Sequence, residues 1–346
     1  MRFGAGYWSM AGTRLRPRHH ALLYEEMIRD AQAAERLGYS DYWLVEHHFW
    51  YDGHSNAELT ALGAIAAATS TIGIGTSVLL MPLHDPLRAS EMAATVDHLS
   101  GGRLQLVFGL GYRDEEYDAF GISRKARAPR LERSIELLDR LWSENGPFDF
   151  ASKHFNYSGI EARPKPVQKR PSMYLGGFVP KTVERAAKYG IGLQLGPVIS
   201  ADQGRELVER YHEAAAEFGT AATGVEIGIC RDFWIAPTTE EARRVARPRL
   251  FHYYGETVAL GWKLFRDPDG ELIYLDRPDL LRAYAKAGVD AAIVGDPDTV
   301  GEELTKLQEA GFTYVQLRFR FDSQPAELIH GAMELFASDV MPKFKD

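Results

Sequence analysis

The sequence has a single cysteine and no apolar segment long enough to cross a membrane. Because Cys230 is the only cysteine among 346 residues, no intrachain disulfide can form, which fits a reducing compartment. No apolar run reaches the roughly 18 residues that a membrane span needs, and residues 1–4 lack the apolar region of a secretory signal. We therefore expect a cytoplasmic protein with no membrane partner, in which Cys230 is a buried packing residue.

The sequence also lacks a block of like charge. Its 40 Lys and Arg against 48 Asp and Glu give a formal net charge of −8, and the densest basic stretch, residues 124–133, is interrupted by Ala, Pro, Leu and Glu. Binding to a phosphate backbone usually requires a basic stripe, so the composition argues against a nucleic-acid partner. With 45% hydrophobic and 25% charged residues and no internal repeat, the chain has the composition of a globular protein.

What the chain does contain is a regular alternation of strand-length apolar segments with helix-periodic segments. This pattern predicts right-handed βαβ units and a parallel sheet. Eight units without a clear break predict an α/β fold, a (β/α)8 TIM barrel spanning residues 1–346 as a single domain; an open doubly wound sheet is the alternative. The predicted strands are residues 3–7, 42–46, 72–79, 104–109, 173–176, 191–195, 227–235 and 314–319, and the short segment 291–294 is interpreted as an excursion outside the barrel.

A typical barrel takes about 250 residues, which leaves about 100 for insertions. Two long irregular stretches could contain them: residues 145–171, rich in Pro and Lys, and residues 248–290, rich in aromatics. We expect the second insertion to lie over the C-terminal mouth of the barrel, where active sites of this fold are found. The residues that follow each strand are therefore the candidates for chemistry.

A carboxylate and two histidines follow the second predicted strand. Side chains alternate along a strand, so His47 lies on the same face as Trp43, whereas Glu46 and His48 lie on the opposite face. Histidine at this position can act as an acid or base near neutral pH, although a hydrogen-bonded structural cluster explains the same residues as well. Adjacent histidines diverge and no H-x-x-x-H pattern is present, so we expect no metal.

In three further segments, small residues stand at or directly after the end of a predicted strand. Residues 73–86 run from a buried strand into a Pro-punctuated loop, and Gly109 and Gly111 follow the fourth strand without the third glycine of a dinucleotide-binding motif. Residues 173–182 combine a strand, a glycine pair and a helix N-terminus, which is an arrangement that binds anions through free N–H groups and the helix dipole. Tight strand–helix packing is the alternative for residues 73–86, and an ordinary βα turn is the alternative for residues 173–182.

Aromatic side chains are concentrated near strand ends and in the second insertion. They could line an apolar substrate pocket, although scattered surface aromatics or a dimer interface explain them nearly as well. The candidate substrate-binding residues are Trp8, Trp50, Met81, His252 and Tyr253, with Tyr51, Tyr254 and Trp262 nearby.

Taken in order, these segments resemble the luciferase-like flavin monooxygenases and their deazaflavin-using relatives. The resemblance extends from residue 1 to about residue 344. Five motifs carry it: residues 41–49 with Glu-His-His-Phe, residues 97–104 with D-x-x-S-x-G-R, the glycine loop and E-x-x-x-F-G element of residues 108–122, the P-x-P-x-Q and Gly-Gly stretch of residues 163–177, and G-x-P-x-x-V at residues 295–300.

The resemblance implies roles for particular residues. His47 corresponds to the active-site histidine near the flavin, and Ser77 and Val78 correspond to a non-prolyl cis peptide beside the isoalloxazine. Gly109, Gly111 and Gly176 belong to the implied cofactor site, and the residues implied around the flavin phosphate are Gly177, Phe178, Lys181, Thr182 and Arg130.

The resemblance further implies reduced FMN supplied by a separate flavin reductase, oxygen and a small to medium apolar organic molecule as substrates, and a homodimer formed through helices 58–69 and 88–99. The chain has Gly111 or Leu110 where luciferases have a cysteine, which disfavours light production, and Ile191 where the family often has the Asp of Gly-Asp-Gly. The Gly-x-Gly-Glu-x-x-Asn-Glu motif of the deazaflavin branch is absent, which favours FMN over deazaflavin. A deazaflavin-dependent oxidoreductase and a non-catalytic flavin-binding protein or partner subunit are the alternatives.

Overall fold

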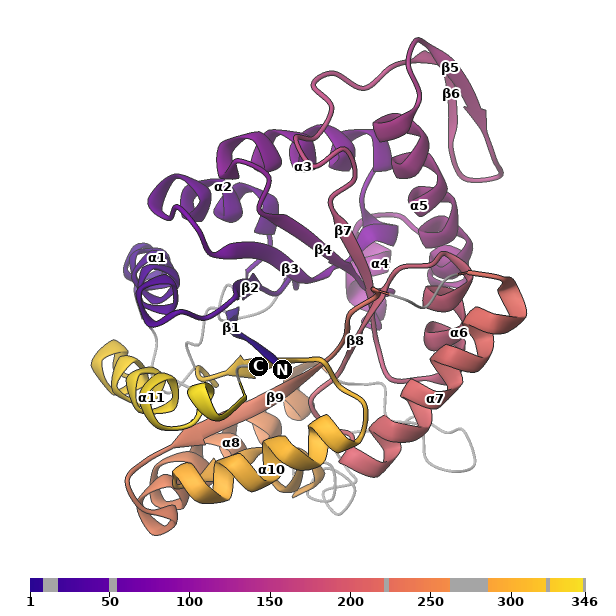
Figure 1. Cartoon of the computed structure of the whole chain (residues 1–346). Helices are drawn as coiled ribbons and strands as arrows, with labels where there is room; N and C mark the ends of the chain where they lie inside the picture. The colour runs from indigo at the N-terminus through magenta and orange to yellow at the C-terminus, as the bar shows by residue number, and fades with distance from the viewer. Residues whose placement is uncertain (9–17, 50–54, 221–223, 262–285, 322–323, 345–346) are drawn as a thin grey trace.

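Eight parallel strands close into a barrel in the computed structural model of the chain (Figure 1), which describes residues 1–8, 18–49, 55–220, 224–261, 286–321 and 324–344. Neighbouring strands pair in parallel around the ring, and the pairing of β8 with β9 closes it. The prediction of a (β/α)8 TIM barrel is confirmed, and the open sheet is excluded. The barrel strands are β1 (Arg2–Trp8), β2 (Asp41–Leu44), β3 (Gly73–Leu79), β4 (Leu104–Phe108), β7 (Ser172–Gly176), β8 (Gly192–Leu195), β9 (Ile227–Ile235) and β11 (Tyr314–Arg318).

The short strand β10 (Ile293–Gly295) lies outside this ring. It pairs in parallel with the last residues of β9, Phe233 to Ile235, and takes no part in closing the barrel. The interpretation of this segment as an excursion is therefore confirmed.

Helices surround the barrel strands (Figure 1). Their ends follow local sequence signals: Gly38 and Gly101 end the first and third helices in the left-handed conformation, at φ 81° and 67°, and Asp85 caps the third helix through the N–H of Arg88. The helices are α1 (His20–Leu37), α2 (Glu58–Ala68), α3 (Pro86–Ser100), α4 (Asp114–Ala119), α5 (Arg127–Ser143), α6 (Pro180–Lys188), α7 (Ala201–Phe218), α8 (Thr239–Gly261), α10 (Pro297–Glu309) and α11 (Ala326–Asp339).

Both predicted irregular stretches contain regular structure. The first includes an antiparallel hairpin of β5 (Phe148–Ala151) and β6 (Asn156–Ile160), which projects beyond the ring of helices in Figure 1. The second begins inside α8, which continues through Pro248 to Gly261 because Leu250 and Tyr254 are buried against the core. Residues 262–285 lie outside the described residues, so the placement of this insertion over the mouth stays a prediction.

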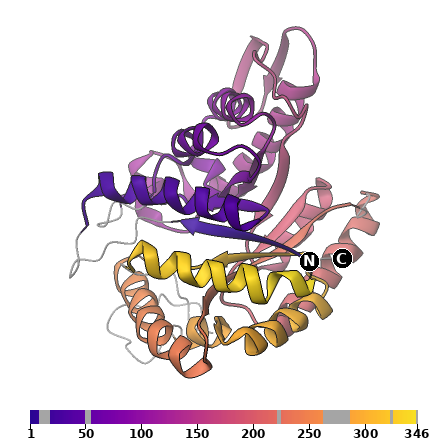
Figure 2. The ribbon, with the colours of Figure 1, turned by 60° about the vertical axis from the view of Figure 1, so that its left-hand side comes forward.

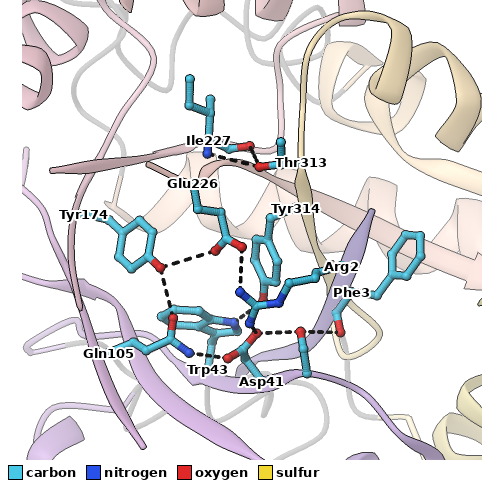
Figure 3. A network of polar contacts seen from close by, with 11 residues as sticks. Arg2, Phe3, Asp41, Trp43, Gln105, Tyr174, Glu226, Ile227, Thr313 and Tyr314 are labelled. Atoms are coloured by element: carbon cyan, nitrogen blue, oxygen red, sulfur yellow. Dashed lines mark hydrogen bonds and ion pairs between the residues drawn. The ribbon is translucent and has the colours of Figure 1, made fainter. Parts of the chain in front are cut away.

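The N-terminal end of the barrel is closed by a polar network (Figure 3). The Arg2 guanidinium lies 2.8 Å from carboxylate oxygens of both Asp41 and Glu226, and Gln105 donates to the other oxygen of Asp41. Above it, the Trp43 indole N–H donates to the Tyr314 hydroxyl inside the barrel. Because these groups belong to the beginnings of their strands, they lie at the opposite end from the strand C-termini.

The two ends of the chain meet on one side of the barrel. Helices α1 and α11 lie side by side in both ribbon views (Figures 1 and 2), and the Met1 ammonium donates to the Phe344 carbonyl at 3.0 Å. Within the described part of the chain, no helix has the length and apolar character that a membrane crossing requires.

Candidate active site

A pocket opens at the C-terminal ends of the barrel strands, where barrel active sites are found. Its wall is mostly apolar or glycine, with a few polar groups from separate strands. Its main contributors are Val45, Glu46 and His47 after β2; Ser77, Val78 and Leu80 at β3; Gly109 to Tyr112 after β4; Gly176 to Val179 and Thr182 after β7; Gln194 to Val198 after β8; Cys230 on β9; Tyr253 and Tyr254 on α8; and Arg318 on β11.

His47 projects into this pocket between two partners. Its Nδ1 lies 3.1 Å from Glu116 Oε1, and its Nε2 lies 3.2 Å from the Tyr112 hydroxyl. Glu116 is fully buried on α4, and burial alone would raise its pKa. The hydrogen bonds from His47 and from the His48 backbone N–H, together with the charge of Arg113, instead lower that pKa below its ordinary value. Glu116 is therefore an ionised carboxylate directly behind the imidazole.

Glu46 and His48 form a second, separate network, as the alternation of side chains predicts. Glu46 Oε1 lies 2.8 Å from Nε2 of both His48 and His84, and its other oxygen accepts the Leu80 backbone N–H. Burial opposes ionisation of Glu46, but the charges and hydrogen bonds of His84 and His48 outweigh it and lower its pKa to about 2. This network ties the end of β2 to the loop after β3, so the structural interpretation applies to Glu46 and His48.

Glu58, at the start of α2, adds an acidic group beside this network. Burial and the nearby charge of Glu46 raise the pKa of Glu58 well above its ordinary value, which favours the neutral form of this acid beside the Glu46 carboxylate.

Some glycines of the pocket wall are needed because a neighbouring side chain, Val78, packs directly against them. The Ser77–Val78 peptide bond is cis, as the resemblance implies. A Cβ at Gly109 or Gly176 would lie 2.3 Å from a methyl carbon of Val78, so both glycines are required for packing around that side chain. Packing against Val78 therefore explains these two glycines.

The loop between β7 and α6 fits an anionic group such as the phosphate of a flavin mononucleotide. Gly177 has φ 150°, and its N–H donates to the Gln194 carbonyl at 3.1 Å, so that N–H is already used. Within the described residues, the N–H groups of Phe178 and Val179 have no acceptor, and α6 has no side-chain cap. These donors at a helix N-terminus, with the Thr182 hydroxyl in the pocket wall, are the arrangement that binds phosphate.

The opposite side of the pocket carries a buried ion pair. Arg318 donates to Asp232, which also accepts the Tyr254 hydroxyl, and Arg318 donates to the Tyr253 hydroxyl at 2.8 Å. Cys230 lies nearby and is buried, as predicted, and burial raises the pKa of its thiol to about 12. This thiol is therefore protonated, and it forms part of the pocket wall.

Most of the predicted site residues meet in this pocket. They are His47, Ser77, Val78, Gly109, Gly111, Gly176, Gly177, Phe178, Thr182 and Tyr253. Two phosphate candidates do not line it: Arg130 lines a separate basic hollow and donates to the Pro82 carbonyl, and Lys181 is exposed.

Four of the substrate candidates do not line the pocket or lie outside the described residues. Met81 is fully buried in the hydrophobic core, and His252 does not line the pocket. The Trp8 side chain and Trp50 lie outside the described residues. The residues that sequence reasoning gave no role are Tyr112, Glu116, Gln194 and Arg318; Tyr112 and Glu116 lie in the glycine-loop and E-x-x-x-F-G motifs, which is the signal that could have identified them.

The family model for luciferase-like monooxygenases matches residues 5–314. The chain belongs to this family. The alkanal monooxygenase alpha chain of Photorhabdus laumondii is 23% identical over 335 residues, which cover 93% of this chain and 92% of that protein. As a member of the luciferase-like family, the chain is a flavin-dependent oxidoreductase, and the resemblance seen in the sequence is confirmed.

Two solved structures show the same fold over the full length. The oxygenating constituent of 3,6-diketocamphane monooxygenase of Pseudomonas putida, in complex with FMN, has a TM-score of 0.83 at 20% identity and covers 100% of this chain and 99% of that chain. An F420-dependent secondary alcohol dehydrogenase, in complex with an F420–acetone adduct, has a TM-score of 0.76 at 18% identity and covers 100% of this chain and 99% of that chain. Solved structures with this fold thus include both an FMN-bound monooxygenase component and an F420-dependent dehydrogenase.

Proposed function

We propose that this chain is the oxygenase component of a two-component, cytoplasmic FMN monooxygenase that acts on a small to medium apolar organic substrate. The observation that carries the proposal is the pocket itself: an apolar wall, a phosphate-type helix N-terminus on one side, and His47 between Glu116 and Tyr112 on another. Reduced FMN, when bound, supplies the electrons that activate oxygen.

The chain's own residues would bind and orient the reactants. The N–H groups of Phe178 and Val179 and the Thr182 hydroxyl would hold the FMN phosphate, because these donors lie at a helix N-terminus and have no acceptor among the described residues. The apolar wall formed by residues such as Val78 and Leu195 would exclude water from the reacting atoms, which strengthens the electrostatic interactions there. His47 would exchange a proton with the reactants.

Two features support a separate reductase and an apolar substrate. The diketocamphane enzyme is described as an oxygenating constituent, which implies a partner that reduces its flavin. The wall of the pocket presents few charged groups, and Arg318 is neutralised by Asp232. A molecule with a largely apolar body fits such a wall.

A deazaflavin-dependent oxidoreductase is the second candidate, supported by the fold shared with the F420-dependent dehydrogenase. Anaerobic titration of the protein with reduced FMN and with reduced coenzyme F420 distinguishes the two. We expect tighter binding of reduced FMN, followed by oxygenation of an added apolar substrate when air is admitted. Tighter binding of F420 would select the deazaflavin enzyme, and binding of reduced FMN without oxygenation of any substrate would leave a non-catalytic flavin-binding protein.

We also propose that the single barrel domain acts as a homodimer through α2 and α3. These helices pack against each other and are rich in alanine, and Leu99 near the end of α3 is 56% exposed. Small residues permit close approach of helices, and an exposed leucine beside them favours an apolar contact. Light scattering at micromolar concentration is expected to give twice the 38.8 kDa mass of one chain, and a monomer would contradict the proposal.

A further inference from the structure

The two ring nitrogens of His47 have different partners, and this difference determines which nitrogen exchanges a proton. Glu116 Oε1 accepts the His48 backbone N–H at 2.9 Å and lies 3.3 Å from Arg113 Nη1, in addition to its contact with His47 Nδ1 at 3.1 Å. An ionised carboxylate can only accept hydrogen bonds. His47 Nδ1 must therefore carry a hydrogen and donate it to Glu116, which leaves Nε2 as the exchanging nitrogen.

His47 Nε2 is directed at a tyrosine of the pocket wall. The Tyr112 hydroxyl lies 3.2 Å from Nε2, and the two rings meet edge to face with centroids 5.5 Å apart. Both side chains line the pocket, so a phenol hydroxyl stands beside the imidazole where reactants would bind. A hydroxyl can donate one hydrogen bond while accepting another, so it can pass a proton from the imidazole to a third group.

We propose that Glu116, His47 and Tyr112 form a proton relay in which Tyr112 is the catalytic residue that delivers the proton to a reactant oxygen. Glu116 is a positioning residue that fixes the hydrogen on His47 Nδ1. The assignment rests on the proposed function, because that function brings an oxygen atom of the reactants into this pocket.

The relay moves one proton and no electrons. The His47 imidazolium gives its Nε2 proton to the Tyr112 oxygen, and the Tyr112 O–H bond breaks as its own proton passes to the reactant oxygen. The imidazolium becomes neutral, the phenol ends neutral, the reactant gains one proton, and Glu116 stays ionised. His47 is recharged from solvent, to which 13% of its side chain is exposed.

The first test reads the tautomer directly and needs no activity. Side-chain nitrogen NMR of the full-length protein labelled at histidine, with the His47 signals identified by their loss in His47→Gln, is expected to show a protonated Nδ1 and a bare Nε2 in the neutral form. Glu116→Gln should change this to a mixture of tautomers, whereas Asp118→Asn, which removes an exposed charge from the same helix, should not. A bare Nδ1 in the wild type, or no change in Glu116→Gln, would overturn the relay.

The second test follows the reoxidation of enzyme-bound reduced FMN by oxygen in a stopped-flow experiment across pH. The rate should fall on the alkaline side as His47 loses its proton, and in Glu116→Gln that fall should move to lower pH by about one unit or more. Tyr112→Phe should slow the reaction about 100-fold without moving the fall. An unshifted profile in a folded Glu116→Gln, or an unchanged rate in Tyr112→Phe, would contradict the relay. If reduced FMN does not bind the wild type, the proposed function fails, while the tautomer measurement still decides on the relay.

Discussion

The neighbours of His47 are held in place by contacts that do not involve the His47 side chain. Its neighbours Glu116 and Glu46 are anchored by other groups, namely backbone N–H donors and the histidines at positions 48 and 84. We therefore expect His47→Ala to keep the fold and the affinity for FMN. Loss of acid–base assistance should lower turnover by about 10²–10⁴-fold, and oxygen consumption with reduced FMN measures it. A lower melting temperature with normal turnover per folded molecule would instead establish a structural role for His47.

Gly177 combines a backbone requirement with a place in the pocket wall. At φ 150° any side chain is strained, and a Cβ would lie 3.1 Å from the Thr182 methyl carbon, which must then move. Gly177→Val should therefore raise the FMN dissociation constant by tenfold or more, as followed by quenching of flavin fluorescence.

The matched control for this variant is Gly219, which ends α7 at φ 68° with no atom within 4 Å of an added Cβ. Gly219→Val should cost about 1–2 kcal/mol of stability and leave FMN affinity unchanged. Equal affinities in the two variants would mean that the phosphate binds elsewhere.

Sequence reasoning reached the pocket through residues that lie directly after strands, such as His47 and Gly177. It gave no role to Glu116, because this residue is 69 positions from His47 and its contact depends on how α4 packs beside β2. Met81 also follows a strand but is buried in the core and does not line the pocket, since a residue after a strand can point into the core as easily as into the pocket. Local spacing predicts where a strand ends, but the direction of a side chain beyond that end depends on tertiary packing.

At the scale of elements, the barrel strands were predictable because most of their residues are buried and therefore apolar. The hairpin of β5 and β6 escaped prediction because its strands are short and mostly exposed, so no apolar period marks them. The irregular stretch predicted from residue 248 instead begins inside α8, although proline normally ends a helix. There the burial of Leu250 and Tyr254 outweighs that preference.

The loop between α2 and β3 is fixed by one carboxylate from α1. Glu35 Oε1 accepts the backbone N–H groups of Ser70, Thr71 and Ile72 at 2.7, 2.6 and 3.1 Å. Burial would raise the pKa of Glu35, but these hydrogen bonds lower it to about 2. Because the folded-state pKa is depressed, the stabilisation is present above the ordinary value of 4.5 and is lost as the pH falls toward 2.

Glu35→Gln should therefore lower the free energy of unfolding at neutral pH by about 1–2 kcal/mol. The difference from the wild type should shrink between about pH 5 and pH 2, as measured by denaturant unfolding at each pH. Glu25→Gln on the same helix is the control, because Glu25 is 57% exposed and pairs with Arg29 only at 3.6 Å. A difference for Glu35→Gln that stays constant over this pH range would show that the charge of Glu35 is not what holds the loop.

At the scale of the whole molecule, we expect the two ends of the barrel to have different roles: one end contains the pocket for chemistry, and the other stabilises the fold. The pocket occupies the C-terminal mouth, and the network of Arg2, Asp41 and Glu226 closes the other end (Figure 3). In parallel barrels, substitutions at the N-terminal end affect stability, whereas those at the C-terminal end affect catalysis. A substitution in the network should thus change stability without changing turnover.

Arg2→Gln tests this separation. The Asp41 and Glu226 side chains are only 1% and 15% exposed, and without Arg2 their charges face each other with no cation between them. Breaking a buried pair costs several kcal/mol; since 52% of the Arg2 side chain is exposed, we expect a loss of about 2–3 kcal/mol at neutral pH. Burial raises the pKa of Glu226 and the charge of Arg2 opposes this, so without Arg2 part of the loss should be recovered as the pH falls and Glu226 takes up a proton.

Arg88→Gln provides the matched control for that variant. It removes the same charge from an exposed pair with Glu91, whose side chains are 72% and 46% exposed, and should change stability by less than about 0.5 kcal/mol. Both variants should bind FMN and consume oxygen at the wild-type rate per folded molecule. If Arg2→Gln slowed turnover while remaining folded, the two ends of the barrel would be coupled. The assignment of stability to the N-terminal end and of catalysis to the C-terminal end would then be contradicted.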